Sequence, residues 1–202
     1  MSERRAEAGM TLVEMMVTMS LLGIVATMFL SIMVSVQAGV ERQMDRSHDN
    51  DQVRLAVQQL DKEIRSGNVL YDPAAETAPF APHYSLRVYT QANADVRTPG
   101  NRCVQWRITD GELQRRDWST ADPSGTVSGW RVVAENVVNV ELGVPAFVLD
   151  SDPTKGGRIV DVTIATQTDG DSGNPVSVAA SISGRNTSYG YPLSVCAVVP
   201  LA

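Results

Sequence analysis

One long apolar run near the amino terminus constrains this chain more than any other feature of its sequence. Across residues 10–36 the only charged side chain is Glu14. About 20 apolar residues are enough for a helix to cross the hydrocarbon core of a bilayer, and this run is longer. The sequence therefore predicts a membrane-spanning helix, with Arg4 and Arg5 holding the residues before it on the cytoplasmic side.

The order of features around this run differs from that of an ordinary secretory signal. Such a signal places small residues at a cleavage site beyond its apolar core, whereas here the small residue Gly9 precedes the core. Glu14 is informative, because a carboxylate inside a membrane helix costs a few kcal/mol unless it is paired or functional. Cleavage after Gly9 would create an amine on Met10, roughly 6 Å along the helix from Glu14. That amine, from the same or an adjacent subunit, would neutralise the carboxylate; the alternative is a boundary carboxylate that reaches the headgroups.

Residues 9–16, with the sequence GMTLVEMM, resemble the type III signal of prepilins and pseudopilins. That signal combines a glycine, an aromatic residue or methionine, a short apolar stretch and a glutamate. The resemblance implies cleavage after Gly9 by a membrane-embedded prepilin peptidase and N-methylation of Met10. It also implies that Glu14 helps to recruit or dock the subunit during assembly.

The same resemblance implies a place and a set of partners for the protein. It would be a single-pass protein of the cytoplasmic membrane with an extracytoplasmic C-terminal domain. Its partners would be other pilin or pseudopilin subunits, which it contacts through the N-terminal helix, and the pilus assembly platform. Many major pilins carry a proline within the N-terminal helix. This chain has none before Pro73, which favours a minor pilin or a pseudopilin.

Beyond residue 36 the helix is expected to continue as an amphipathic segment over residues 37–67. Apolar residues recur at helical spacing on one face: Val53, Val57, Leu60 and Ile64. Gly67 followed by Asn68 predicts the end of the helix, and Pro73 makes continuation unfavourable. The alternative is a flexible break within residues 37–50, where Gly39 and polar residues weaken the periodicity.

The remainder of the chain is typical of β-structure. The expected strands are residues 85–89, 103–108, 112–116, 130–134, 137–144, 158–166 and 176–183. Asp110 and Gly111 predict a tight hairpin between two of them. The predicted fold class is α+β and pilin-like, with the long N-terminal helix packed on one mainly antiparallel sheet. The expected domains are a leader (1–9), a transmembrane part of the helix (10–36), an extracytoplasmic helix (37–67) and a β-rich globular domain (68–202).

The order of these strands resembles the J-type minor pseudopilins and the W-type minor pilins. Residues 108–115 match the hairpin of those families, and residues 158–164 match a later strand. The tail over residues 187–202 extends past their usual end, which leaves the subtype open.

The two cysteines, Cys103 and Cys196, both lie far from the amino terminus. If this part of the chain is exported, an intramolecular disulfide is the expectation, whereas two free thiols would be equally reasonable in a cytosolic chain.

Catalysis, metal binding and nucleic-acid binding find little support in the sequence. The two histidines, His48 and His83, have no neighbours that suggest a nucleophilic triad. Asp169, Asp171 and Asn174 resemble the start of a calcium loop but lack the spacing of an EF-hand, so we expect neither a metal nor a cofactor. A formal net charge of -6 argues against a broad surface for phosphate backbones.

The function that these patterns favour is structural: a minor pilin or pseudopilin in a type IV pilus or a type II secretion pseudopilus. Two alternatives stay open. The C-terminal domain is an adhesin or DNA-capturing subunit at a pilus tip, for which a basic or aromatic patch would be the mark. Otherwise the chain is a membrane-tethered extracytoplasmic domain of another function, such as an enzyme with a convergent polar pocket.

Overall fold

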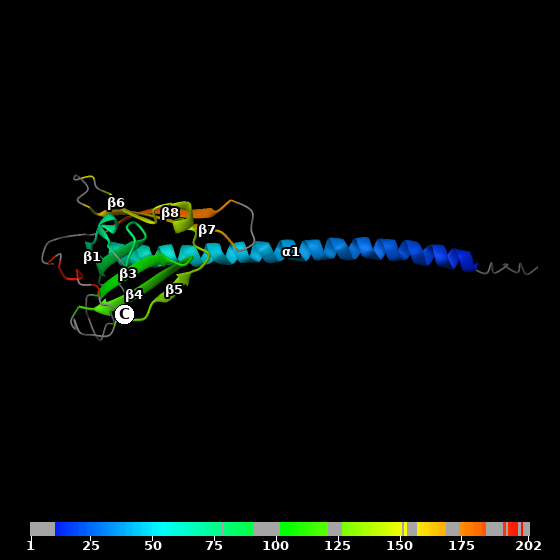
Figure 1. Ribbon diagram of the computed structural model, residues 1–202, viewed down its shortest axis with the longest axis horizontal. Coiled ribbons are helices and arrows are strands. Elements are labelled where there is room, and N and C mark those ends of the chain that lie inside the picture. Colours follow the sequence, from blue (N-terminus) through cyan, green and yellow to red (C-terminus); the bar gives the residue numbers. More distant parts are fainter. Residues whose placement is uncertain are drawn as a thin grey trace, which may run out of the picture. The chain divides into compact units, whose positions relative to one another are not determined.

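The computed structural model describes residues 11–77, 79–90, 102–120, 127–150, 152, 157–168, 174–184, 192, 194–197 and 199 (Figure 1). The chain divides into two compact units, Met1–Met44 and Asp45–Ala202. The helix α1 (Leu12–Arg65) is continuous across the boundary, so the alternative of a break within residues 37–50 is wrong.

In the first unit α1 is a largely apolar helix, and four of its hydroxyl side chains form hydrogen bonds within the helix. Thr18, Ser20, Thr27 and Ser31 each donate a hydrogen bond to a carbonyl three or four residues earlier, at 2.8–2.9 Å. These bonds hide the hydroxyls from an apolar environment. Within the described part of the chain, α1 is the one helix that is long and apolar enough to cross a membrane, with a mean hydropathy of 2.2 over its best 18-residue window.

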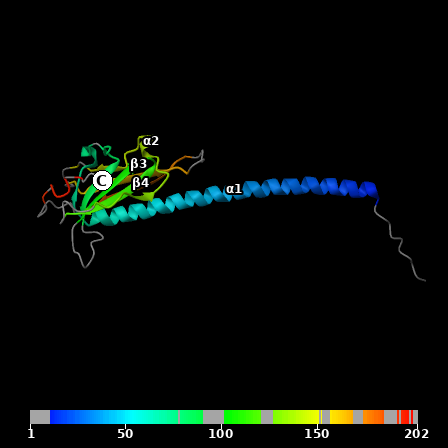
Figure 2. The same ribbon diagram turned by 60° about the horizontal axis from the view of Figure 1, so that its bottom comes forward.

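In the second unit the same helix is amphipathic. Its buried residues recur every three or four positions: Asp49, Val53, Ala56, Leu60, Glu63 and Ile64. This spacing places them on one face, which packs against the sheets (Figure 2). The helix ends at Arg65, two residues before the predicted stop at Gly67.

The β-structure forms two antiparallel sheets, where one was expected. The first has the order β1-β2-β3-β4-β5 and the second the order β6-β7-β8. The strands of the first are β1 (Gly67–Leu70), β2 (Ser85–Thr90), β3 (Arg102–Thr109), β4 (Glu112–Ser119) and β5 (Arg131–Ala134). Those of the second are β6 (Phe147–Leu149), β7 (Ile159–Thr166) and β8 (Val176–Ser183). The short helix η1 (Pro73–Ala75) follows β1.

The predicted hairpin at Asp110 and Gly111 joins β3 to β4 in the structure. Thr109 pairs with Glu112, and the two residues between them have φ angles of 51° and 75°. Positive φ at both central positions is the geometry of a type I′ turn, which Asp-Gly adopts readily.

The strand predicted over residues 137–144 is wrong. Val137 makes only an isolated bridge to Thr166, and a short helix, α2 (Asn139–Leu142), follows it. The reason lies in Asn139, whose buried side chain accepts from Ala165 N (2.8 Å) and donates to Thr163 O (2.8 Å) and Val144 O (3.2 Å). These tertiary hydrogen bonds outweigh the local strand propensity of the surrounding valines.

The main hydrophobic core lies between α1 and the two sheets. Its largest members include Leu60 and Ile64 from α1, Trp106 from β3, Phe147 from β6 and Ile164 from β7. A second, smaller cluster lies on the other face of the five-stranded sheet, since side chains alternate along a strand. It consists of Val69, Tyr89, Cys103, Trp118 and Cys196.

Candidate functional site

The amino-terminal turn of α1 carries one of the residues that the sequence singled out. Glu14 donates its backbone N–H to the Thr11 hydroxyl at 3.3 Å, and Met15 donates its N–H to the Thr11 carbonyl at 3.1 Å. Thr11 is therefore the N-cap, with Glu14 three residues later as in a capping box. A carboxylate in this first turn is favoured by the helix dipole. The predicted cleavage and methylation positions, Gly9 and Met10, lie outside the described residues.

The surface of α1 that follows Thr11 is apolar and exposed. Every large apolar side chain from Leu12 to Val36 keeps 50–74% of its surface accessible. Burying such a surface is favourable by roughly 25 cal/mol per Å², so the first unit is suited to lipid or to the helices of other subunits.

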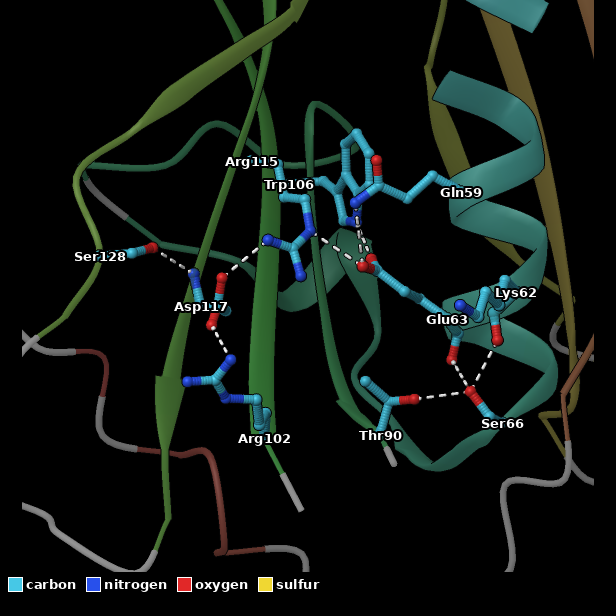
Figure 3. A network of polar contacts seen from close by, with 10 residues as sticks. All are labelled: Gln59, Lys62, Glu63, Ser66, Thr90, Arg102, Trp106, Arg115, Asp117 and Ser128. Atoms are coloured by element: carbon cyan, nitrogen blue, oxygen red, sulfur yellow. Dashed lines mark hydrogen bonds and ion pairs between the residues drawn. The ribbon is translucent and has the colours of Figure 1, made fainter. Parts of the chain in front are cut away.

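A buried polar network ties the second-unit part of α1 to β3 and β4 (Figure 3). The Glu63 carboxylate is fully buried. It accepts hydrogen bonds from Trp106 Nε1 at 2.7 Å, from Arg115 Nε at 2.8 Å and from Gln59 Nε2 at 3.3 Å. A cation and further donors around a buried carboxylate offset part of the cost of removing it from water.

The network continues along β4 to the edge of the unit. Arg115 donates through Nη1 to Asp117 Oδ1 at 2.7 Å, and Arg102 pairs with Asp117 Oδ2 at 3.0 Å. The Asp117 N–H donates to the Ser128 hydroxyl at 2.8 Å. None of these residues lines either of the two cavities described below. Their contacts join α1 to β3 and β4.

Glu63, Arg115 and Asp117 were not among the residues singled out from the sequence. One signal for Glu63 was present, because it lies on the same helical face as Leu60 and Ala56. A carboxylate on a buried stripe requires a partner, but its partner is 52 residues away in the sequence.

Cys103 and Cys196 form a disulfide, with their Cα atoms 5.8 Å apart. Further contacts hold the described residues around Cys196 against β2 and the residue after β1. The Cys196 N–H donates to the Tyr71 hydroxyl at 2.9 Å, and Arg87 Nη1 donates to the Cys196 carbonyl at 2.9 Å. Burial raises the pKa of the Tyr71 phenol, while the Cys196 amide and the Arg87 charge act in the opposite direction.

Two cavities flank the β3–β4 turn. The first, of about 540 Å³, is lined by four carboxylates: Asp110, Glu112, Glu135 and Glu141. The second, of about 450 Å³, is lined by aromatic, apolar and charged groups: Phe80, Tyr84, Arg107, Ile108, Val137, Val140 and Glu141 among them.

Metal ligands do not converge within the described residues. They contain no cluster of three or more histidine, cysteine or acidic side chains with metal-binding geometry. Of the calcium candidates, Asn174 is exposed, and Asp169 and Asp171 lie outside the described part of the chain. His48 contacts Gln52 at 2.8 Å, and His83 Nδ1 contacts the Phe147 carbonyl at 3.2 Å.

Comparison with known proteins bears on the N-terminal segment alone. Residues 4–30 match the model of the prokaryotic N-terminal methylation motif. Neither a curated protein nor a solved structure matches the chain. The motif and the exposed apolar helix together fit a single-pass membrane anchor. The methylation motif at residues 4–30 thus supports a place for this chain among the prepilin-like proteins.

Proposed function

We propose that this chain is a minor pilin or pseudopilin, a structural subunit that is cut after Gly9, methylated on Met10 and packed helix to helix into a pilus or pseudopilus. The observation that carries the proposal is the match of residues 4–30 to the methylation motif, on a helix whose apolar side chains stay exposed from Leu12 onward. The fold of the second unit, in which α1 packs on antiparallel sheets, is compatible with a pilin-like subunit.

Assembly in this proposal has two sources of free energy. The first is the packing of the exposed apolar side chains of α1 against the helices of neighbouring subunits. The second is the pairing of Glu14 with the Met10 amine of a neighbour in a water-poor setting, where an uncompensated charge is costly. Its position in the first turn of α1 keeps Glu14 close to the new amino terminus.

The first test is the intact and N-terminal mass of the full chain, produced with and without a prepilin peptidase. We expect a chain that begins at methylated Met10 only when the peptidase is present. Gly9→Asp should abolish that change in mass and serves as the control for cleavage at this position. A chain that keeps residues 1–9 with the peptidase present would refute the proposal.

A second test separates membrane insertion from assembly. Glu14→Ala should leave insertion intact, because it removes the only charge from the apolar run, but should lower incorporation into filaments at least tenfold. Met15→Ala, one residue further along the same helix, is the matched control and should incorporate normally. Normal incorporation of Glu14→Ala would contradict the role of this carboxylate. Fractionation of membranes and sheared filaments measures both quantities.

A further inference from the structure

Arginines of β2 and β4 in the second unit differ sharply in how their charges are balanced. Arg115 is 5% exposed and lies between the Glu63 and Asp117 carboxylates. Arg87 is paired with Glu76 at 2.6 Å. Arg116, the neighbour of Arg115 on β4, is only 2% exposed and forms no ion pair with any described residue.

The hydrogen-bond partner of Arg116 is uncharged: its Nε donates to the Gln105 amide oxygen Oε1 at 3.0 Å. A second cation, Arg107, makes its position less favourable. Desolvation lowers the pKa of Arg116 first, and the charge of Arg107 lowers it further. A guanidinium does not lose its proton under ordinary conditions, so this charge remains without a carboxylate partner among the described residues.

Both guanidinium groups lie against one indole ring. The Arg107 Cζ atom is 3.8 Å from the centroid of Trp130, and the Arg116 Cζ atom is 4.4 Å from it. In the sheet Arg107 faces Gln114 while Arg116 faces Gln105, so the two arginines are diagonal neighbours on the same face. The Arg116 Cζ atom also lies 5.6 Å from the ring centroid of Phe80 and 5.8 Å from that of Trp118. Aromatic rings offset a buried charge only in part, because their attraction is weaker than that of a charge-assisted hydrogen bond.

We propose that Arg107 and Arg116, held against Trp130, form a binding site for an oxyanion, a carboxylate or phosphate group carried on an apolar body. An oxyanion between the two guanidinium groups would accept hydrogen bonds from both. It would give Arg116 the negatively charged partner that Arg115 and Arg87 already have in carboxylates. Arg107 and Trp130 are partly exposed, which gives access from solvent. Arg107 and Phe80 also line the cavity of about 450 Å³, whose apolar wall at Ile108, Val137 and Val140 suits the body of the ligand. The site is independent of pilin processing and assembly.

The test is the thermal midpoint of the full chain in nonionic detergent at pH 7 and constant ionic strength, with three probes. These are inorganic phosphate, the capped dipeptide acetyl-Phe-Glu-amide, and acetyl-Phe-Gln-amide as the uncharged control. At about ten times the dissociation constant, the binding probe should raise the midpoint by roughly 3–6 °C, and the control should not. A lower half-saturating concentration for the peptide assigns the site to acidic side chains of other proteins, and a lower one for phosphate assigns it to phosphorylated ligands.

Substitutions test whether the rise in thermal midpoint comes from the proposed site. Arg116→Met keeps most of the apolar stem and removes the charge, so it should abolish the rise while the midpoint without probe stays equal or increases. Arg131→Met, at an exposed arginine of β5, is the matched control and should respond as the original chain does. Should Arg116→Met lower the starting midpoint, Arg107→Met provides the same test. The proposal is wrong if no probe shifts the original chain, or if the charge-removing variants respond equally.

Discussion

At the scale of single residues, one side chain that joins α1 to the five-stranded sheet is a carboxylate. Glu63 lies on an otherwise apolar stripe, with no exposed surface, and receives donors from both β3 and β4. A buried charge of this kind adds little net stability compared with apolar packing, but removing one partner is costly because the other is left buried. We expect its contribution to be the fixing of one register of the helix against the strands.

Glu63→Ala is therefore expected to lower the free energy of unfolding by about 3 kcal/mol, since it leaves Trp106 Nε1 without an acceptor and Arg115 with only Asp117. Thermal or denaturant unfolding of the full chain in detergent measures the change. Asp61→Ala is the control, because its pair with Arg65 is exposed and should be worth about 0.5 kcal/mol or less. Equal losses in the two variants would show that the buried network does not anchor the helix.

The titration of Tyr71 links stability to alkaline pH. Because its pKa is raised in the folded state, its contribution is fully present below the ordinary pKa near 10 and is lost as the pH rises through the folded value. Tyr71→Phe should cost about 1 kcal/mol at pH 7 through loss of the Cys196 N–H bond, and should flatten the decline above pH 10. Denaturant unfolding at pH 7 and at alkaline pH checks both expectations. An unchanged alkaline decline would assign it to other groups.

At the scale of elements, the carboxyl end of α1 is a crowded junction. A Cβ atom added at Gly184, just after β8, would lie 2.8 Å from the Ile64 carbonyl oxygen and 2.9 Å from a Leu70 methyl group. A Cβ atom added at Gly67 would likewise lie 2.8 Å from a Val88 methyl group and 2.9 Å from the Ile64 carbonyl oxygen. Both glycines permit the backbone of the sheets to approach the last turn of the helix.

Gly184→Ala should lower the free energy of unfolding by about 1–3 kcal/mol, because the backbone at Ile64 has to move to admit the methyl group. Gly129→Ala is the matched control, since nothing lies within 4 Å of an added Cβ there. The comparison is made by denaturant unfolding of the two variants and the original chain. A neutral Gly184→Ala would mean that the end of α1 adjusts without cost.

At the scale of the whole molecule, the two units differ in where their apolar surface goes. The apolar side chains of the first unit are exposed, whereas most of those in the described part of the second are buried between α1 and the sheets or in the smaller cluster around Cys103. The smaller cluster includes Cys196 near the carboxyl end of the chain, and the disulfide joins positions 93 residues apart.

Loss of this disulfide is expected to lower the free energy of unfolding of the second unit. On the chain-entropy model a loop of this length contributes about 4–5 kcal/mol to stability. The double variant Cys103→Ser/Cys196→Ser should lose about that amount and should become insensitive to dithiothreitol, while reductant should destabilise the original chain. Unfolding with and without dithiothreitol measures the effect. A reductant-sensitive double variant would assign the sensitivity to something other than this bond.

Part of this structure was determined by sequence alone, because it depends on neighbours along the chain. The apolar run makes α1 a helix through local hydrogen bonds, and Asp110 and Gly111 form the hairpin turn through their own φ preferences. The motif that opens α1 is likewise local, and the match over residues 4–30 lies entirely within this stretch.

Only the tertiary structure decided the features that join distant residues. The helix at Asn139 in place of a strand depends on a hydrogen bond to a residue 24 positions away, and the pairing of Glu63 with Arg115 spans 52 positions. The division of the strands into two sheets belongs with them, because it was not evident from the sequence. The isolation of Arg116 belongs to the same class, because the sequence shows a charge but not the missing carboxylate. Local preferences are a few tenths of a kcal/mol per residue, whereas a buried polar group gains or loses several according to what the fold places beside it.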